Sequence, residues 1–278
     1  MPKRILVVSS WVALFSFICL FLSLNGGCTK TETETEYVSA IFLCWLDDYY
    51  QSAVLCSDPL ANPDESEVRI EWNSNSVAFP YSVVYAGYIA FEADFILEIA
   101  TDYTVLLASD VGDCEGTVAI PEETDITDPT YGEILPLGQG VNCAWIDAQG
   151  ADFYWVMYSA EAYDSAGYYV GEVFNDTFIT NNTFTIRADF FDVSGAAWYE
   201  AYIGVQPNGG PPPVPGSSGN MTGSISGFVT AEGYPEYVYF YVGTPQLKLS
   251  KGPQRKIPSV KERMNTYLGQ LGVETVIE

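Results

Sequence analysis

Residues 153–158 read Phe-Tyr-Trp-Val-Met-Tyr, and residues 198–205 read Trp-Tyr-Glu-Ala-Tyr-Ile-Gly-Val. Both stretches are rich in aromatic and β-branched residues, which are enriched in strands. Successive side chains of a strand point to opposite faces, so every second residue shares a face. We expect the even-numbered residues of the first stretch and the odd-numbered residues of the second to point into a core. The outward set then comprises Phe153, Trp155, Met157, Trp198, Glu200 and Tyr202.

Short runs of the same kind extend over most of the chain. They are separated by turn signals such as NPDES at 62–66 and PNGGPPP at 207–213. Many short strands at such intervals are typical of antiparallel sandwiches rather than of βαβ units. The sequence therefore predicts an all-β protein. The predicted strands are Val38–Trp45, Tyr50–Cys56, Glu67–Trp72, Tyr81–Phe91, Tyr103–Ser109, Val141–Trp145, Phe153–Tyr158, Thr183–Phe190 and Trp198–Val205.

Residues 127 to about 235 resemble a fibronectin type III domain, or a close immunoglobulin-like relative. Trp145 stands where that family has the buried tryptophan of its second strand, and Tyr154–Tyr158 matches the Y-x-V-x-Y pattern of its third. Tyr199–Val205 resembles the penultimate strand. The resemblance implies that these last two strands are neighbours in one sheet. The long interval between Trp145 and Tyr199 indicates an insertion near Asp164–Thr180.

A similar spacing of residues upstream predicts a second sandwich. Trp72 is followed at +9, +11 and +13 by Tyr, Val and Tyr, as Trp145 is. Repeats of this kind indicate duplicated units, although coincidence is an alternative in a chain with 20 tyrosines. Pro129 cannot continue a strand ladder, so the junction is expected at Asp125–Pro129. We expect one sandwich over residues 38–126, a fibronectin type III-like one over 127–235, and a strand plus basic tail over 236–278.

The N-terminus reads as an export signal. Lys3 and Arg4 precede an uncharged stretch, Ile5–Leu24, and Gly26-Gly27-Cys28 closes it. Residues 1–28 resemble a lipoprotein signal peptide, which implies a lipid on Cys28. An uncleaved anchor is the alternative, because twenty residues suffice to span a bilayer.

Both readings of the N-terminus place the following residues outside the cytoplasm. Residues 29–37, largely Thr and Glu, form a hydrated tether. Thr29 after the cysteine resembles the sorting signal for an outer membrane, so the predicted location is the outer membrane or surface of a bacterium.

Composition excludes several functions. The formal net charge is −25, and residues 31–247 hold 33 acidic residues against two basic ones, Arg69 and Arg187. That acidity repels nucleic acid. The chain contains no histidine, which removes Ser-His-Asp and Cys-His catalysis and histidine-ligated metals. We therefore predict no enzyme and no cofactor, and we interpret the acidic clusters as solvated turns rather than as metal sites.

Four cysteines of the predicted sandwiches are Cys44, Cys56, Cys114 and Cys143. Cys56 ends a predicted strand, and Cys114 lies in a predicted turn. In immunoglobulin-like sandwiches such loops cluster at one end, so we expect a Cys56–Cys114 disulfide. Cys44 and Cys143 are expected to be buried and free.

The outward set predicts a contact surface. Phe153, Trp155, Trp198 and Tyr202 would form an exposed apolar face, and a patch of that kind usually marks a binding site. Cover by another element of the chain, either Tyr237–Val242 or a terminal helix, is the alternative. That helix would begin at Ser259 within a tail, residues 248–278, that carries six of the eleven basic residues. The tail is either a frayed end, a small helix on its own domain, or a basic arm that docks on the acidic body or on a neighbour.

These features predict a non-catalytic binding, adhesion or structural module, anchored in a membrane outside the cytoplasm, that binds a glycan or a protein through the aromatic face. The alternative is an accessory subunit of a cell-envelope complex. A hydrolase that works with carboxylates alone ranks third.

Overall fold

The computed structural model describes residues 37–44, 51–56, 66–85, 88–93, 98–109, 112–212 and 219–245. These ranges lie in one compact unit, Tyr37–Glu278. They consist of strands, turns and one 3-10 helix, η2 (Ala188–Phe191), which confirms the all-β fold class. The predicted terminal helix and residues 1–36 lie outside the described ranges. Among the helices of the described ranges, none has the length and apolar character needed to span a bilayer.

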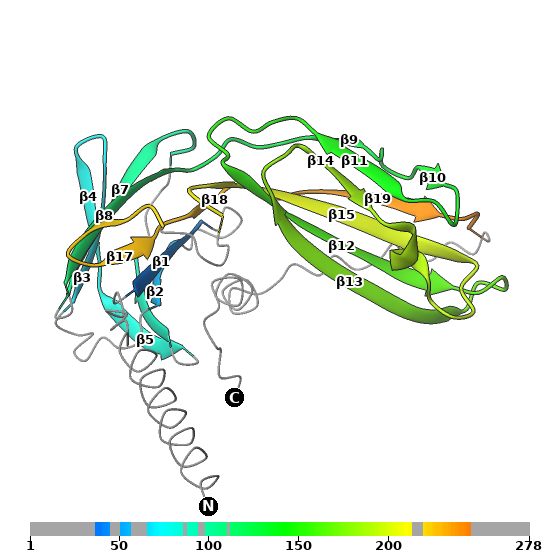
Figure 1. The fold of residues 1–278 in the computed structure, drawn as a ribbon, viewed down its shortest axis with the longest axis horizontal. Coiled ribbons are helices and arrows are strands. Elements are labelled where there is room, and N and C mark those ends of the chain that lie inside the picture. Colours follow the sequence, from blue (N-terminus) through cyan, green and yellow to red (C-terminus); the bar gives the residue numbers. More distant parts are fainter. Residues whose placement is uncertain are drawn as a thin grey trace, which may run out of the picture. The chain divides into compact units, whose positions relative to one another are not determined.

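Residues 126–242 contain two facing sheets (Figure 1). One has the order β14-β11-β9, and the other runs β13-β12-β15-β19-β10. The first comprises β9 (Ile126–Asp128), β11 (Val141–Trp145) and β14 (Thr183–Ile186). The second comprises β10 (Ile134–Leu135), β12 (Phe153–Tyr163), β13 (Tyr169–Ile179), β15 (Trp198–Gly209) and β19 (Glu236–Val242).

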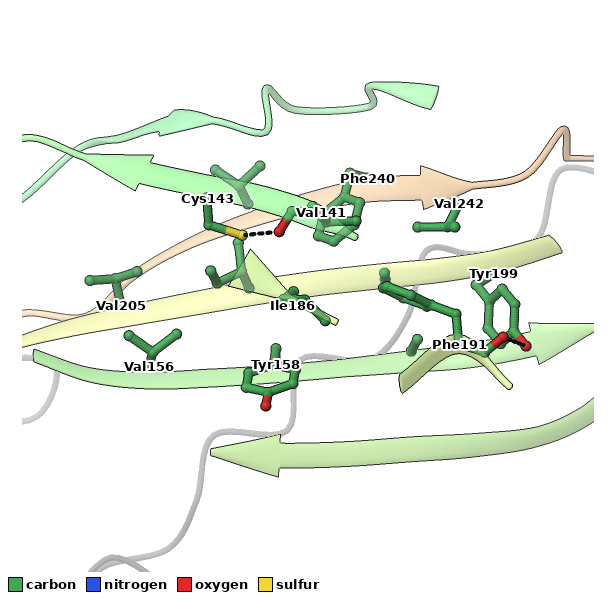
Figure 2. Close-up of a cluster of buried hydrophobic side chains, with 14 of the residues drawn as sticks. Val141, Cys143, Val156, Tyr158, Ile186, Phe191, Tyr199, Val205, Phe240 and Val242 are labelled. Atoms are coloured by element: carbon green, nitrogen blue, oxygen red, sulfur yellow. Dashed lines mark hydrogen bonds between the residues drawn. The ribbon is translucent and has the colours of Figure 1, made fainter. Parts of the chain in front are cut away.

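Alternation along β12 and β15 builds the core of this second sandwich. Tyr154, Val156 and Tyr158 belong to the buried cluster between the sheets, as do alternate residues of β15 from Tyr199 to Val205. Figure 2 shows part of the cluster, with Val156 and Val205 facing Val141 and Cys143 of β11. Trp145 is buried in the same cluster. The predicted inward set is therefore confirmed.

A tyrosine hydroxyl closes one end of this core. The Tyr199 hydroxyl donates to the carbonyl oxygen of Phe191 at 2.5 Å and accepts from the backbone N–H of Val193 at 3.0 Å. Tyr199 lies near the start of β15, so its bonds run back to the segment just upstream. The tyrosine corner of immunoglobulin-like sandwiches has this arrangement.

The first sandwich is built of shorter strands around a second core cluster. A five-stranded sheet, in the order β16-β8-β7-β3-β4, faces the strands β18-β1-β2-β6-β5. The first sheet comprises β3 (Glu67–Trp72), β4 (Asn75–Phe79), β7 (Asp102–Ala108), β8 (Asp113–Ala119) and β16 (Thr222–Gly223). The second comprises β1 (Tyr37–Cys44), β2 (Gln51–Cys56), β5 (Tyr81–Tyr85), β6 (Tyr88–Glu92), β17 (Ser226–Phe228) and β18 (Ala231–Glu232).

The internal repeat seen in the sequence does not correspond to equivalent strands. Trp72 ends β3, which forms a hairpin with β4 through Asn73 and Ser74, both at positive φ. Trp145 ends β11, whose neighbours are β14 and β9. The two sandwiches therefore have different strand orders, although both are built around cores of alternating residues.

The two sandwiches share a strand. Ala231 of β18 pairs with Phe42 of β1 and with Gly209 of β15, so one continuous sheet runs through both. A Cβ on Gly209 would lie 2.1 Å from the carbonyl oxygen of Ala119, so the close approach of the two segments requires glycine there. The predicted boundary at 235 placed residues 222–232 in the second sandwich. Of these, β16 and β17 pair with β8 and β1 of the first sandwich, whereas β18 pairs with strands of both.

The predicted Cys56–Cys114 disulfide is wrong. Cys114 is a free, buried thiol. It lies within β8 rather than in a turn, and its side chain belongs to the core of the first sandwich, so the argument from clustered loops does not apply. Cys143 is free and buried, as predicted. The side chains of Cys44 and Cys56 lie outside the described part of the structure.

Both described thiols are held in the protonated form. Burial raises the pKa of Cys114 to about 11, helped by the nearby Asp113 carboxylate. Burial raises the pKa of Cys143 to about 12, with a smaller contribution from Asp128. Because the thiolate is the nucleophile, iodoacetamide at about pH 8 should alkylate Cys114 and Cys143 only after unfolding in urea. Mass spectrometry of tryptic peptides measures this, and rapid labelling of either cysteine in the native protein would contradict the assigned packing.

The Tyr199 hydroxyl should contribute to stability through two backbone groups. Tyr199→Phe leaves the Phe191 carbonyl and the Val193 N–H without this partner, which should cost about 1–3 kcal/mol of unfolding free energy. Tyr131→Phe, at a side chain that is 81% exposed, is the matched control and should change stability by less than about 0.5 kcal/mol. Urea titration followed by fluorescence measures both, and equal effects would show that the corner adds nothing.

Candidate functional site: the outer face of the second sandwich

We define the outer face as the side of the β13-β12-β15-β19 sheet that points away from β11 and β14. Strand register arranges its residues in cross-strand rows. In the order β13-β12-β15-β19, successive rows are Phe178-Trp155-Gln206, Asp176-Met157-Gly204-Tyr237, Phe174-Ser159-Tyr202-Tyr239, Glu172-Glu161-Glu200-Tyr241 and Tyr169-Tyr163-Trp198. The register thus places Trp155, Tyr202 and Trp198 on one face, in the first, third and fifth rows, and Phe153 pairs with Asn208 just before the first row.

The prediction that this face is exposed is wrong. Phe153, Trp155, Trp198 and Tyr202 are 0%, 1%, 3% and 3% exposed. They nevertheless belong to neither core cluster, so they lie outside the core between the sheets. The parity argument located them correctly, but parity reports only which way a side chain points and not what covers it.

A hydrogen bond fixes the largest side chain of the face. Trp155 Nε1 donates to Asp176 Oδ2 at 2.7 Å, and its ring lies 5.9 Å from that of Phe178. Burial raises the pKa of the Asp176 carboxyl above its ordinary value, and the bond from Trp155 lowers the pKa only in part. The carboxylate therefore carries an electrostatic cost when it ionises within an aromatic surface.

Ring contacts join β12, β15 and β19 across the face. The Tyr163 and Trp198 rings are stacked, with centroids 4.4 Å apart and planes 11° from parallel. The Tyr202 ring lies 6.3 Å from Tyr237 and 5.9 Å from Tyr239. A Cβ on Gly204 would meet the Tyr237 ring at 2.5 Å, so this ring fills the space that glycine leaves open. Aromatic rings of neighbouring strands are therefore in contact on this face.

Three glutamates interrupt the aromatic rows. Glu161 pairs directly with Glu172 on one side and with Glu200 on the other, so their side chains leave the sheet on the same side. The Tyr163 hydroxyl donates to Glu161 Oε2 at 2.6 Å. Glu200 is only 4% exposed. Like charges directly opposite each other on a sheet are destabilising, so this row carries an electrostatic cost.

The exposed aromatic residues lie at the edge of the sheet. β13 pairs with β12 on one side, and no described strand pairs with its other side. Tyr169 and Phe174 of this strand are 55% and 53% exposed. Sequence reasoning missed β13, because residues 164–180 were interpreted as an insertion. The sequence does contain a strand signal here, because residues 169–178 read YVGEVFNDTF. The aromatic and β-branched residues of this stretch are typical of a strand.

The remaining predicted features are the acidic clusters and the lipidation site. Within the described ranges, no group of three or more acidic, cysteine or histidine side chains could hold a metal ion. Glu122, Glu123, Asp125 and Asp128 are exposed, but Asp128 lies in β9 rather than in the predicted turn. Cys28, the predicted lipidation site, lies outside the described residues.

No protein-family model matches the chain, and no curated protein matches it. Similar solved structures include fibronectin(III)-like modules of CbhA from Clostridium thermocellum, with 9% identity and a TM-score of 0.24, over 79% of this chain and 100% of that one. A Ca²⁺-stabilized adhesin that helps an Antarctic bacterium bind ice has 12% identity and a TM-score of 0.18, over 71% and 49%. A protein from Corynebacterium diphtheriae described as membrane anchored has 12% identity and a TM-score of 0.20, over 80% and 61%. TM-scores this low do not establish a common fold, so the description of the fold rests on the strand pairing.

The partly buried carboxyl of Asp176 should make stability depend on pH. Its pKa is raised in the folded state, so the unfolded chain ionises first and stability falls as the pH rises from the ordinary value to the raised one. Asp176→Asn keeps an acceptor for Trp155 and removes this component. The unfolding free energy of the variant should exceed that of the wild type by a margin that grows through this window and is constant above it.

Urea titrations at several pH values measure that margin. Asp125→Asn, at an exposed carboxyl, is the control and should not reproduce it. A margin for Asp176→Asn that shrinks with rising pH would contradict the assigned direction of the shift.

Proposed function

We propose that the protein is a non-catalytic binding and structural module, held at a membrane outside the cytoplasm, that contacts a protein partner through the β13 edge. The observation that carries this proposal is the shared strand β18. It hydrogen-bonds β1, the first strand after the tether, to β15 of the sandwich that bears the edge. Backbone pairing, rather than a flexible linker, thus connects the two sandwiches. Such a connection suits a module that presents a contact surface at the end of an anchor.

Four polar side chains around the shared strand support a structural role, and three of them, Gln206, Asn208 and Thr230, are buried. Asp152 Oδ2 accepts from the Gly210 N–H at 2.7 Å, and Thr230 Oγ1 donates to the Gly209 carbonyl at 2.8 Å. Gln206 Nε2 donates to the Gly233 carbonyl at 3.2 Å, and Asn208 Nδ2 donates to the Gln206 carbonyl at 2.8 Å. These side chains satisfy backbone groups where the chain crosses between the sandwiches, which stabilises that crossing.

The β13 edge favours a protein over a glycan. A strand without a neighbour presents a row of N–H and C=O groups, and extended peptides bind such edges by adding a strand. Exposed aromatic side chains beside the edge, Tyr169 and Phe174, add apolar contact area. The proposal therefore moves the contact surface from the buried face to the neighbouring edge of the same sheet. A fibronectin type III-like sandwich is consistent with peptide binding at a sheet edge.

Export supports the assigned location. Lys3, Arg4, the apolar stretch Ile5–Leu24 and Gly26-Gly27-Cys28 form a lipoprotein-like signal. We propose that Cys28 carries the lipid and that the module lies on the outer membrane or cell surface of a bacterium. A stable partner in the same envelope would make the protein an accessory subunit, and a partner on another surface would make it an adhesin.

Photo-crosslinking tests the contact surface. A photoreactive residue at position 174 of the intact, membrane-held protein should capture one defined protein, and the same residue at exposed position 131 should not. Tyr169→Ala with Phe174→Ala should weaken this binding by more than about tenfold, because each buried aromatic contributes roughly 1.5–3 kcal/mol, while the thermal midpoint stays within a few degrees. Capture of a glycan alone, or no capture at position 174, would overturn the proposal.

A further inference from the structure

A cavity of about 530 Å³ lies on the inner side of the β13 edge, and residues of β12, β13, β14 and η2 line it. Among the described strands, β13 pairs only with β12, and β14 pairs only with β11. Both are therefore edge strands, and the cavity lies on the open side of the second sandwich. Its volume is within the range of cavities that hold ligands. A partner that binds the β13 edge would thus meet this cavity.

Three aromatic rings line the cavity. The centroid of the Tyr158 ring lies 5.3 Å from that of Phe184 and 4.8 Å from that of Phe190. Phe184 and Phe190 are half-buried, so part of their apolar surface remains accessible. Tilted and edge-to-face contacts between aromatic rings are favourable beyond the burial of apolar area. The cavity therefore favours an aromatic side chain as its occupant.

The charged groups that line the cavity are balanced. The Arg187 guanidinium donates from Nε to Asp189 Oδ1 at 3.1 Å and from Nη2 to Asp189 Oδ2 at 2.7 Å. This bidentate pair joins one positive and one negative charge. A neutral side chain therefore fits the cavity better than a charged one.

Asn175 marks the place where the open edge meets the cavity. Its side chain accepts from the Asp176 N–H at 2.9 Å and donates to the Tyr158 hydroxyl at 3.0 Å. The Asp176 N–H thus points away from β12. Because pairs alternate along an antiparallel ladder, the backbone groups of Phe174 and Glu172 point the same way. A strand added to β13 can pair as far as Phe174, and its next residue lies opposite Asn175.

The side chain of that next residue points toward the cavity. Asn175 pairs with Tyr158, which belongs to the core cluster, so both lie on the inner side of the sheet. Directly opposite residues share a face of the sheet. The residue of an added strand opposite Asn175 therefore projects over the aromatic rings, whereas the residue opposite Phe174 lies on the outer side.

Glu172 gives the outer side of this edge a negative charge. It is exposed and pairs with Glu161 of β12. Like charges in this arrangement are destabilising, whereas opposite charges across a strand pair are favourable. A Lys or Arg opposite Glu172 would thus offset the repulsion. The net charge of −25 attracts basic partners as well.

We propose that the partner adds an extended peptide to β13, with an aromatic residue three positions from a basic one. The aromatic side chain lies opposite Asn175 and enters the cavity, the basic one lies opposite Glu172, and an apolar residue lies opposite Phe174. Backbone hydrogen bonds at a sheet edge supply affinity, and pockets for alternate side chains supply specificity. This inference rests on the function proposed above and names the chemistry that its partner presents.

Selection from a random peptide library displayed on phage tests this pattern on the full chain in detergent. The selected peptides should carry an aromatic residue three positions from Lys or Arg, and they should crosslink to a photoreactive residue at position 174. Peptides that crosslink there without the pattern would overturn the inference, and so would failure to select any peptide. Capture of the natural partner at position 174 decides separately whether the proposed function stands.

Matched substitutions assign the aromatic contact. Thr177 is half-buried and lines the cavity, so Thr177→Trp should fill part of it. Binding of a selected peptide should weaken by more than about tenfold, whereas a peptide with its aromatic residue changed to alanine should lose little further affinity. Thr183→Trp, at an exposed position of β14 that does not line the cavity, is the control. Additive losses would show that the aromatic side chain does not occupy the cavity.

A charge reversal assigns the basic contact at an exposed position, where folding is not at risk. Glu172→Lys should weaken binding about two- to fivefold, and a peptide with its basic residue changed to Glu should regain that loss. Glu122→Lys, at another exposed glutamate, should give no such exchange. Thermal melts check that each variant is folded. Failure of the reversed peptide to recover binding would overturn the assigned register.

Discussion

The ladder between β12 and β15 is the interaction on which the second sandwich depends. All 11 residues of β12 pair with β15, and every residue of β15 is buried. One face of the ladder packs against β11 and β14, and its alternate residues form the core with Trp145. The other face carries the aromatic rows. A strand pair buried on both faces leaves little freedom of register, because a slip of one residue would exchange the two sets of side chains.

The same ladder extends into the shared strand. β15 continues from its pairing with β12 and β19 to Gly209, which pairs with β18, and β18 in turn pairs with β1. Glycine is required there because the backbone passes against Ala119 of the first sandwich. Hydrogen bonds from Gln206, Asn208 and Thr230 then satisfy the backbone where the sheet crosses over. Packing in one sandwich is thus connected with packing in the other through backbone pairing.

Charge is segregated along this chain in a way that gives the outer face its character. The described ranges contain two basic residues, both ion-paired, while Glu161, Glu172 and Glu200 lie side by side on one sheet face. Six of the eleven basic residues follow the last described strand. Acidic and basic residues are therefore concentrated in different parts of the sequence.

Composition, turn signals and alternation predict the fold class and the direction in which each strand residue points. Alternation along 153–158 and 198–205 is a local property, so it predicts which residues share a face with Trp155 and with Tyr202. That the two strands are neighbours was implied only by the resemblance, and the register shows it. Three features depend on the tertiary structure: the burial of these two side chains, the free thiol at Cys114, and the pairing of β16 and β17 with the first sandwich. Each depends on contacts between segments far apart in the chain. Strand periodicity determines which way a side chain points, whereas its exposure depends on which other segments pack against it.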